Sequence, residues 1–429
     1  MVKIFIAVLF FSISISAQFH NKNFNQTTNK VRSEVFVSVI SDSVHNVYFL
    51  FKFPYSCLVF EKKNSNFISK YEIALEIKNS KEQVVERKFH KAEIELNEYE
   101  KTISENEFIT DFFEFELPED TFSCKVTYTD LITGKPFDIF NQKIDLIRTN
   151  DLPRWLLLKH SNANKNNVFE IDIFGKIIPY SSVNYDLLII GNNELSKLEK
   201  VRIKSEDTVL VLDEIVKLDR ALPQLKSLNN KLLIEFKSDS EISDSINSSG
   251  KNKATALIVK NINQKLFEGK YLIGLQTNEG ELIKEFPVLI QWIDKPKSLM
   301  DYDFALEMIE FIEVNQRYRT YFSSENEKKN KLMSYWKQKD PTPHTSFNEL
   351  MNEFYSRVDF AQNEFISVSV KNGAITDRGR VFIINGKPEK IDRKVNSDGK
   401  VVESWYYQNP ERIFRFIDFR GDGSFKILQ

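Results

Sequence analysis

Residues 71–79 read YEIALEIKN, and this stretch sets the class of the fold. Ile73, Leu75 and Ile77 occupy every second position, and the residues between them are glutamate and alanine. Because successive side chains of a strand point to opposite faces, this period of two predicts a β-strand with one buried face.

Similar short segments surround this one and are separated by polar turns. Between residues 31 and 150 they read EVFVSVI, VYFLFKF, DFFEFELP, CKVTYTDL and FNQKIDLI. After Pro153 a second set reads NVFEIDIFG, VNYDLLIIG, NKLLIEFKS, TALIVKN and GKYLIGLQTNEGELIKEFPVLIQW, the last predicting a hairpin that turns at 278–280. The spacing predicts two consecutive all-β domains, each an immunoglobulin-like antiparallel sandwich.

The pattern changes from strands to helices after residue 295. Apolar residues at 305, 308, 309 and 312 recur at helical spacing, and Ser324 with Glu327 predicts a capped helix start. A third helix is expected over 346–365, begun by a capping box of Ser346 and Glu349. Its expected apolar stripe is Phe347, Leu350, Met351, Phe354, Val358, Ala361 and Phe365. Terminal strands follow, so the last part of the chain is predicted to be an α+β domain of helices and an antiparallel meander.

The first residues have the layout of a secretory signal peptide. Lys3 precedes an apolar and small-residue stretch from Ile4 to Ala17, which is too short for a membrane span of roughly 20 residues. We therefore expect cleavage near Ala17 and an exported chain without a transmembrane segment. It would reside in the periplasm, at the outer membrane or outside the cell. The predicted division is a signal peptide over 1–17, sandwiches over 18–150 and 151–295, and the α+β domain over 296–429.

The charge balance gives no indication of a nucleic-acid partner. Lysine plus arginine number 59 against 61 acids, so no excess of positive charge is present to bind phosphates. The two cysteines, Cys57 and Cys124, leave two alternatives open. In an oxidising compartment they could form a disulfide, or they could be two buried thiols, and the sequence does not choose between them.

Several pieces after residue 296 resemble, in order and spacing, the bacterial GWxTD domain proteins. They are YWKQKDPTPHTSFNE at 335–349, FYSRVDFAQNEF at 354–365, GAITDRGRVFIINGKPEKI at 373–391, ESWYY and FRFIDFRGDGSFKIL. The resemblance implies an exported chain with strand-rich regions ahead of this domain, and it names no reaction. The signature reads GAITD here, so Ala374 replaces the family's tryptophan, and that position faces either a core or a partner.

The charged cluster Asp377, Arg378 and Arg380 has two interpretations. The arginines could hold a carboxylate or phosphate of a partner, with Asp377 orienting one of them. Alternatively Thr376 caps a helical turn with Asp377 at its positive end, and the arginines bind carboxylates such as Asp340 or Glu349. A helix is favoured over a strand for 377–384, although Gly379 and the run Val381–Ile384 favour a strand.

Asp340, His344 and Glu349 fit no common metal-binding spacing, and no nucleophile or nucleotide motif occurs. We expect no metal and no cofactor. Arg357, in the FYSRVDFAQNEF piece, is a further candidate. It and the residues Asp340, Glu349, Asp377, Arg378 and Arg380 are expected either to bind a partner or to form contacts that stabilise the domain itself. The expected function is a non-enzymatic envelope module that binds protein or glycan. The alternative is an envelope-acting hydrolase or transferase that uses the carboxylates near TDRGR and DPTP.

Overall fold

The computed structural model describes residues 31–41, 44–147, 154–160, 167–191, 193–206, 209–212, 214–237, 254–313, 324–408 and 410–428. The predicted signal peptide lies outside these residues. Packing divides the chain into two compact units. The first holds 1–178, 184–262 and 269–289, and the second holds 179–183, 263–268 and 290–429. The domain boundaries predicted at residues 150 and 295 stay predictions. The two units are defined by packing, and segments of one alternate with segments of the other along the sequence, so they do not test these boundaries.

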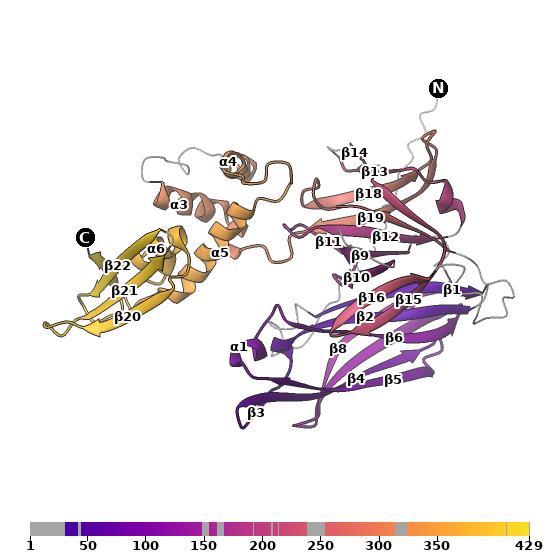
Figure 1. Cartoon of the computed structure of the whole chain (residues 1–429), viewed down its shortest axis with the longest axis horizontal. Helices are drawn as coiled ribbons and strands as arrows, with labels where there is room; N and C mark the ends of the chain where they lie inside the picture. The colour runs from indigo at the N-terminus through magenta and orange to yellow at the C-terminus, as the bar shows by residue number, and fades with distance from the viewer. Residues whose placement is uncertain are drawn as a thin grey trace. The chain divides into compact units, whose positions relative to one another are not determined.

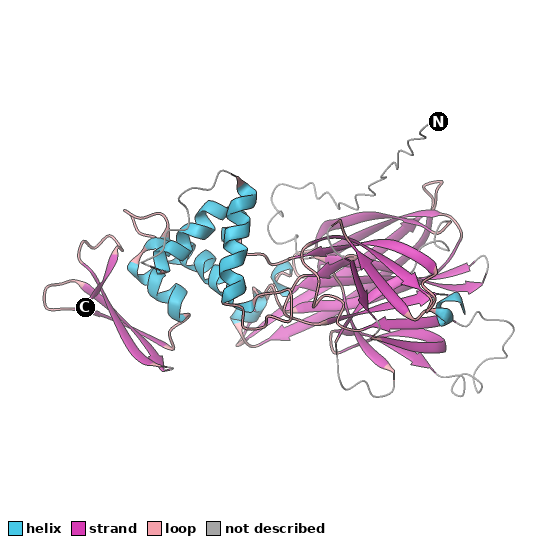
Figure 2. Ribbon diagram, turned by 90° about the horizontal axis from the view of Figure 1, so that it is seen from above, coloured by secondary structure: helices cyan, strands magenta, loops and turns pink. Residues whose placement is uncertain are grey.

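Antiparallel sheets make up the first unit (Figures 1 and 2). One sheet has the order β1 (Arg32–Ser41), β2 (Val44–Pro54) and β6 (Phe108–Pro118). A second joins β3 (Glu61–Lys63), β4 (Asn66–Lys78), β7 (Thr121–Asp130) and β8 (Lys135–Asp145), with β5 (Val84–Leu96) paired to β4. Short helical turns lie at η2 (Tyr55–Cys57) and α1 (Tyr99–Thr102).

The remaining strands of this region form a closed barrel and a further open sheet. The barrel runs β10 (Val168–Asp172), β16 (Lys231–Lys237), β15 (Ile215–Leu228), β17 (Ala254–Val259), β12 (Tyr185–Gly191) and β9 (Arg154–Lys159). The open sheet has the order β11 (Ile177–Pro179), β19 (Leu282–Gln291), β18 (Gly269–Gln276), β13 (Lys200–Lys204) and β14 (Val209–Leu212). The short helical turn η4 (Asn193–Lys197) connects β12 to β13 along the chain. The predicted class of antiparallel strands followed by an α+β part is confirmed.

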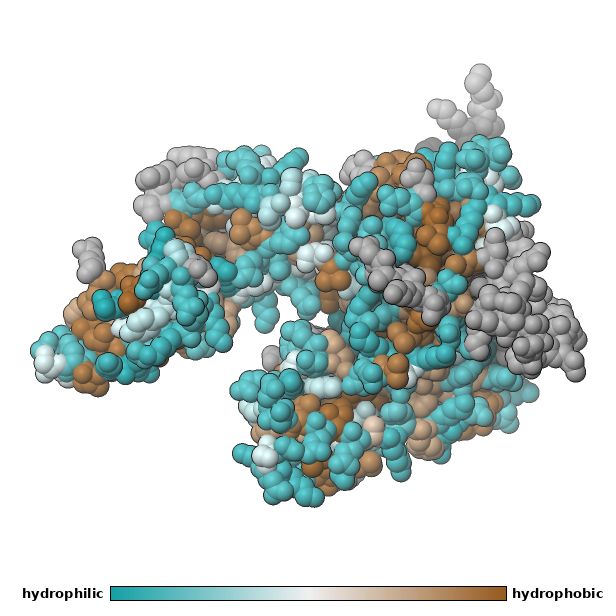
Figure 3. Space-filling model, in the orientation of Figure 1, coloured by the Kyte–Doolittle hydropathy of each residue, from teal (hydrophilic) through white to brown (hydrophobic). Residues whose placement is uncertain are grey.

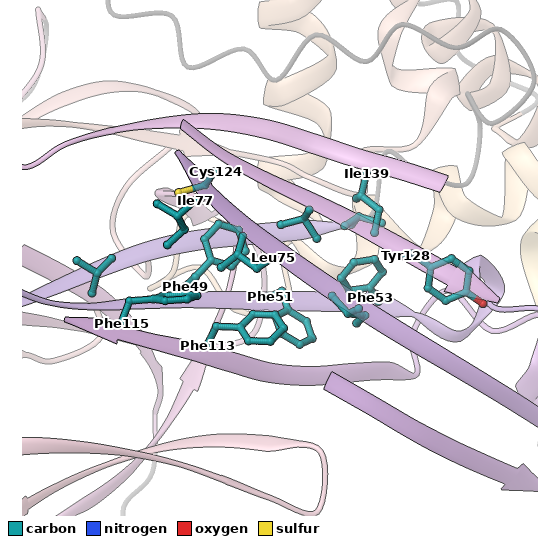
Figure 4. Packing of buried hydrophobic residues seen from close by; sticks show 14 of the residues in the cluster. Phe49, Phe51, Phe53, Leu75, Ile77, Phe113, Phe115, Cys124, Tyr128 and Ile139 are labelled. Carbon is teal, nitrogen blue, oxygen red and sulfur yellow. The ribbon is translucent and has the colours of Figure 1, made fainter. Parts of the chain in front are cut away.

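The sheet β1–β2–β6 is buried on both faces. On one face Phe49, Phe51 and Phe53 pack into a core with β4 and β7, which Figure 4 shows. On the other face Tyr48 and Leu50 join a second core made with the barrel strands. This double burial explains why residues 47–53 read VYFLFKF with almost no polar interruption, whereas β4, with one buried face, alternates.

The second unit places helices on one face of an antiparallel sheet. Its helical elements are η5 (Lys297–Met300), α3 (Tyr302–Ile312), α4 (Glu325–Gln338), α5 (Glu349–Glu364), η6 (Gly373–Ile375) and α6 (Asp377–Asn385). The strands β20 (Lys390–Val395), β21 (Val401–Gln408), β22 (Glu411–Asp418) and β23 (Phe425–Leu428) pair in that order. Trp405 and Phe416 point to the helix side, where their rings meet at 4.9 Å between centroids and Trp405 contacts Phe365 at 5.3 Å.

The first turns of the helices test the predicted caps. Ser324 caps α4 by accepting a hydrogen bond from the Glu327 amide, as predicted. The cap predicted for α5 is wrong, because Asn348 accepts from the Met351 amide instead. The helix begins at Glu349, so the N-cap position falls on Asn348, and the Ser346 hydroxyl donates to the Leu266 carbonyl at 2.7 Å.

The stripe predicted on α5 is also partly wrong. Met351, Val358 and Ala361 are buried, but Leu350 is 44% exposed. Tyr355, which the sequence prediction left out, is fully buried, and its hydroxyl donates to the Ala305 carbonyl at 2.9 Å. A buried tyrosine is tolerated because its hydroxyl has this partner.

Candidate functional site

Residues 377–385 form the helix α6, the favoured alternative for this stretch. Thr376 accepts a hydrogen bond from the Gly379 amide at 3.0 Å, and Asp377 lies in the first turn. A carboxylate is stabilised there by the free amides and the helix dipole. Asp377 also accepts a hydrogen bond from the Ile427 amide at 2.9 Å, which ties the helix start to β23.

The two arginines of the cluster point to different parts of the unit. Arg378 is buried, its Nη1 lies 3.6 Å from Glu403 Oε1, and its Nη2 donates to the Gly423 carbonyl at 3.2 Å. Arg380 instead lies over the ring of Phe311 in α3, at 5.3 Å. Because the guanidinium groups diverge, they do not form a shared fork for a carboxylate or phosphate of a partner. The carboxylates suggested for them, Asp340 and Glu349, are not the ones beside Arg378.

Arg378 sits at the centre of a buried charged network that the sequence analysis missed. Its guanidinium carbon lies 4.2 Å from the Phe425 ring centroid, and burial lowers the pKa of the Arg378 side chain. Glu403 Oε1 also accepts from the Trp405 indole at 2.7 Å, and its Oε2 accepts from Arg393 at 2.8 Å. The sequence does contain a signal for this network: Glu403 lies two positions before Trp405, so in a strand the two side chains point to the same face of β21.

Asp340 and Glu349 meet through a threonine. The Thr342 hydroxyl donates to Glu349 Oε2, and the Thr342 amide donates to Asp340 Oδ1 at 2.8 Å. These bonds hold the DPTP connector between α4 and α5. In the described part of the chain, no group of three or more His, Cys, Asp or Glu side chains has the arrangement of a metal site.

Ala374 is fully buried in η6, between α5 and α6. Of the two alternatives for this position, the structure has the one in which it faces a core. Trp405 and Tyr407 also turn inwards, and the Tyr407 hydroxyl donates to the Gly386 carbonyl at 3.0 Å. Ala374 of the GAITD signature, like Trp405 and Tyr407 of β21, thus belongs to the buried interior of this unit.

Cys57 and Cys124 are free thiols in the structure, with Cys124 buried and Cys57 partly buried. Val59 donates a hydrogen bond to the Tyr128 hydroxyl, so the Cys57 segment lies beside Tyr128 of β7. Burial raises the pKa of both thiols to about 12.

A groove with an aromatic floor opens beside α5. Its volume is about 420 Å³. One face of α5 forms a wall with Glu353, Ser356, Arg357, Phe360 and Glu364; Phe365, Phe382 and Trp405 line it further, and Lys387, Pro388 and Ile391 complete it. The Phe360 ring is 49% exposed and stacks on Phe382 with 4.7 Å between centroids. Hydrophobic residues reach the surface among hydrophilic ones in this unit (Figure 3).

Arg357 borders the groove and fastens two helices together. Its Nε donates to Glu353 Oε1 at 2.7 Å, and its Nη1 donates to the carbonyls of Ile383 and Ile384 at the end of α6. Gly386 follows with φ +78°, and a Cβ there would lie 3.1 Å from Arg357 Nη2. The glycine therefore both ends the helix and leaves room for the guanidinium.

A smaller cavity of about 110 Å³ lies elsewhere in the second unit, lined by Tyr180, Trp292, Lys295, Leu332 and others. Asp340, Glu349 and Asp377 line neither this cavity nor the groove. Within the described residues no helix is long and apolar enough to cross a membrane.

Comparison with known proteins identifies the C-terminal region. The family model of the GWxTD domain matches residues 269–422, which confirms the resemblance seen in the sequence. The match begins at β18, earlier than the expected residue 296. No curated protein matches the chain.

Two solved structures share low similarity with the chain. The structure titled BspA_C_WT is 11% identical, covers 61% of this chain and 99% of its own, and has a TM-score of 0.15. The C-terminal domain of the Streptococcus agalactiae AgI/II polypeptide BspA is 10% identical with the same coverage and a TM-score of 0.14. Scores this low do not establish a shared fold.

Proposed function

We propose that this chain is exported to the cell envelope and acts there as a non-enzymatic interaction module. The GWxTD domain binds an envelope protein or glycan, and the strand-rich unit carries it. The export part of the proposal is supported by Lys3 and the apolar stretch from Ile4 to Ala17.

The observation that carries the proposal is the groove beside α5. Phe360 is half exposed at a concave surface, where an apolar side chain or a sugar ring could cover it. Exposed aromatic residues in pockets commonly supply much of the binding energy of an interface. Polar and charged groups at its border, among them Ser356, Glu364 and Lys387, offer hydrogen bonds that would orient a ligand.

The three carboxylates of the alternative enzyme hypothesis already have partners within the fold. Asp340 and Glu349 accept from Thr342, and Asp377 accepts from the Ile427 amide. A general acid and base must reach the reacting atoms, and these groups line neither cavity. The geometry thus favours a binding module over a hydrolase or transferase.

The experiment compares the wild-type chain with Phe360→Ser and a matched variant, Ile384→Ser. Ile384 is 48% exposed on α6 and lies outside the residues that line the groove. Each protein is crosslinked in envelope fractions and, separately, titrated with purified peptidoglycan fragments while tryptophan fluorescence is recorded, because Trp405 lies at the groove.

We expect Phe360→Ser to lose the crosslinked protein or the response to fragments, and Ile384→Ser to keep it. The two arms distinguish a protein from a glycan. Equal binding by all three proteins, or no binding in either arm, would count against the proposal. Cell fractionation that leaves the chain in the cytoplasm would remove the export part.

A further inference from the structure

The two edges of the C-terminal sheet differ in how free they are to pair. On β23 the Ile427 amide already donates to Asp377 of α6, which leaves this edge less free to pair. β20 is the strand at the other end of the order, and Ile391 and Val395 on it are 52% and 67% exposed. Figure 1 shows β20 as the outer strand of this sheet. An exposed edge strand presents unpaired backbone groups that can pair with another strand.

The backbone groups that face the open edge can be assigned from the neighbouring turn. The Asn396 amide donates to the Lys400 carbonyl at 2.9 Å, so this pair is hydrogen-bonded. Hydrogen-bonded and non-bonded pairs alternate along an antiparallel ladder. Counting back from Asn396, the backbone groups of Ile391, Arg393 and Val395 point away from β21 and towards the open edge.

Two copies of this strand placed antiparallel to each other have complementary side chains. In IDRKV (391–395), an antiparallel copy centred on Arg393 sets Ile391 opposite Val395 and Asp392 opposite Lys394. Both pairs then occur twice. This register also joins the outward-facing backbone groups of Ile391, Arg393 and Val395 to one another, so side chains and backbone select the same alignment.

We propose that the chain forms a two-fold symmetric dimer in which β20 pairs antiparallel with β20 of a second copy, centred on Arg393. The pairing covers the exposed side chains of Ile391 and Val395. It also sets Asp392 against Lys394 of the partner copy at non-hydrogen-bonded positions, where side chains are closest.

The two Arg393 side chains meet at the two-fold axis. Each is already bound by the buried Glu403 through its Nε at 3.1 Å and its Nη2 at 2.8 Å, so its charge is partly compensated within its own copy by a carboxylate that it shares with Arg378. The contact is isologous, so each copy uses the same edge, and on the other edge the Ile427 amide already donates to Asp377 of α6. Association therefore closes at two copies and does not continue into a fibre.

This inference goes beyond the proposed function and does not rest on it, since β20 can pair without a ligand in the groove. Ile391 belongs both to the open edge and to the border of the groove, so pairing would cover one border of each groove. If both hold, each assembly carries two grooves. A partner that engages both would bind more tightly than the single groove allows, by avidity.

The test is a charge exchange measured by sedimentation velocity on the full chain at concentrations up to about 100 μM, which would reveal dimers of moderate affinity. Asp392→Lys sets two lysines against each other, and Lys394→Asp sets two aspartates. We expect each variant to weaken dimerisation at least tenfold. The double variant restores the opposite charges and should dimerise like the wild type.

Mixing the two single variants supplies the sharpest measurement. A chain with Asp392→Lys and a chain with Lys394→Asp are complementary in this register, so the mixture should form heterodimers at concentrations where each variant alone is mostly monomeric. Arg412→Asp, an exposed position on β22, is the matched control and should dimerise like the wild type. Circular dichroism checks that each variant is folded.

A wild-type chain that is monomeric at these concentrations would overturn the proposal, and the lysines of β20 would then serve to prevent pairing. Single variants that dimerise as well as the wild type would overturn it too, because the contact would lie elsewhere. Ligand binding by the groove is scored separately with Phe360→Ser, so the failure of one proposal does not imply failure of the other.

Discussion

Gly379 lies against the carbonyl of Gly373, so close that a Cβ added to Gly379 would stand 2.1 Å from that oxygen. A Cβ on Gly373 would in turn lie 2.2 Å from the Ala361 carbonyl oxygen of α5. Both contacts involve backbone atoms, which cannot move aside as a flexible side chain can. The two glycines therefore allow α5, η6 and α6 to approach closely.

Gly379→Ala is expected to destabilise the second unit by about 3 kcal/mol, because the methyl group overlaps backbone atoms. In an unconstrained helix the same change stabilises by about 1 kcal/mol, so the sign itself is diagnostic. Hydrogen exchange of peptides from α5 and α6 measures the change. Gly269→Ala, on β18 of the first unit, is the control, because an added Cβ there would meet only ordinary contacts from 3.5 Å outwards, and it should leave exchange in these helices almost unaltered. Unchanged or slower exchange in Gly379→Ala would contradict the packing described.

Glu403→Gln should destabilise this unit by about 3 kcal/mol, because it leaves the buried Arg378 without its carboxylate. Arg393→Gln removes the second arginine that binds Glu403. Because the Arg393 side chain is 61% exposed, this change should lower the free energy of unfolding by less than about 1 kcal/mol. Urea unfolding followed by tryptophan fluorescence compares the two. Equal losses would mean that Arg378 does not depend on Glu403.

Ala374→Trp restores the residue of the family signature and should destabilise the domain by about 3 kcal/mol or more, since Ala374 has no exposed surface. The midpoint of thermal unfolding measures this. Ile375→Trp is the control, because Ile375 is 43% exposed and can accept a larger ring. A variant Ala374→Trp that melts at the wild-type temperature would show that the core has room for the ring.

Stability of the first unit should fall at alkaline pH. The thiols of Cys57 and Cys124 have a pKa raised by burial from 9.0 to about 12, so the folded state keeps their protons longer than the unfolded state does. This contribution is complete below about pH 9 and is lost as the pH rises to about 12, at about 1.4 kcal/mol per pH unit for each thiol. Urea unfolding at pH 8 and pH 10 should therefore show a smaller pH effect in a Cys57→Ala, Cys124→Ala variant. An identical pH effect in both proteins would contradict the prediction.

Local patterns predicted much of this fold. The alternation of Ile73, Leu75 and Ile77 and the cap at Ser324 depend on neighbours in sequence, and both are confirmed. Ser346 was expected to cap α5 but bonds to Leu266, which is 80 positions away. The exposure of Leu350 and burial of Tyr355 likewise depend on which elements pack on α5, which helical periodicity alone does not specify.

The candidate site shows the same division. Thr376, Asp377 and the helix after them followed from local capping rules. The partner of Arg378 is Glu403, on a strand 25 positions later, and the groove takes residues from α5, α6, β20 and β21. No single stretch of sequence contains such a groove, so only the folded chain reveals it.

The sheet β1–β2–β6 has a consequence for how this chain can change over evolutionary time. Phe49 and Phe51 belong to one core and Tyr48 and Leu50 to another, on a single strand. A recombination event that replaced the barrel strands alone would leave Tyr48 and Leu50 facing a foreign surface. We therefore expect the two strand-rich regions to be inherited as a pair, so that related chains either retain both or have replaced both.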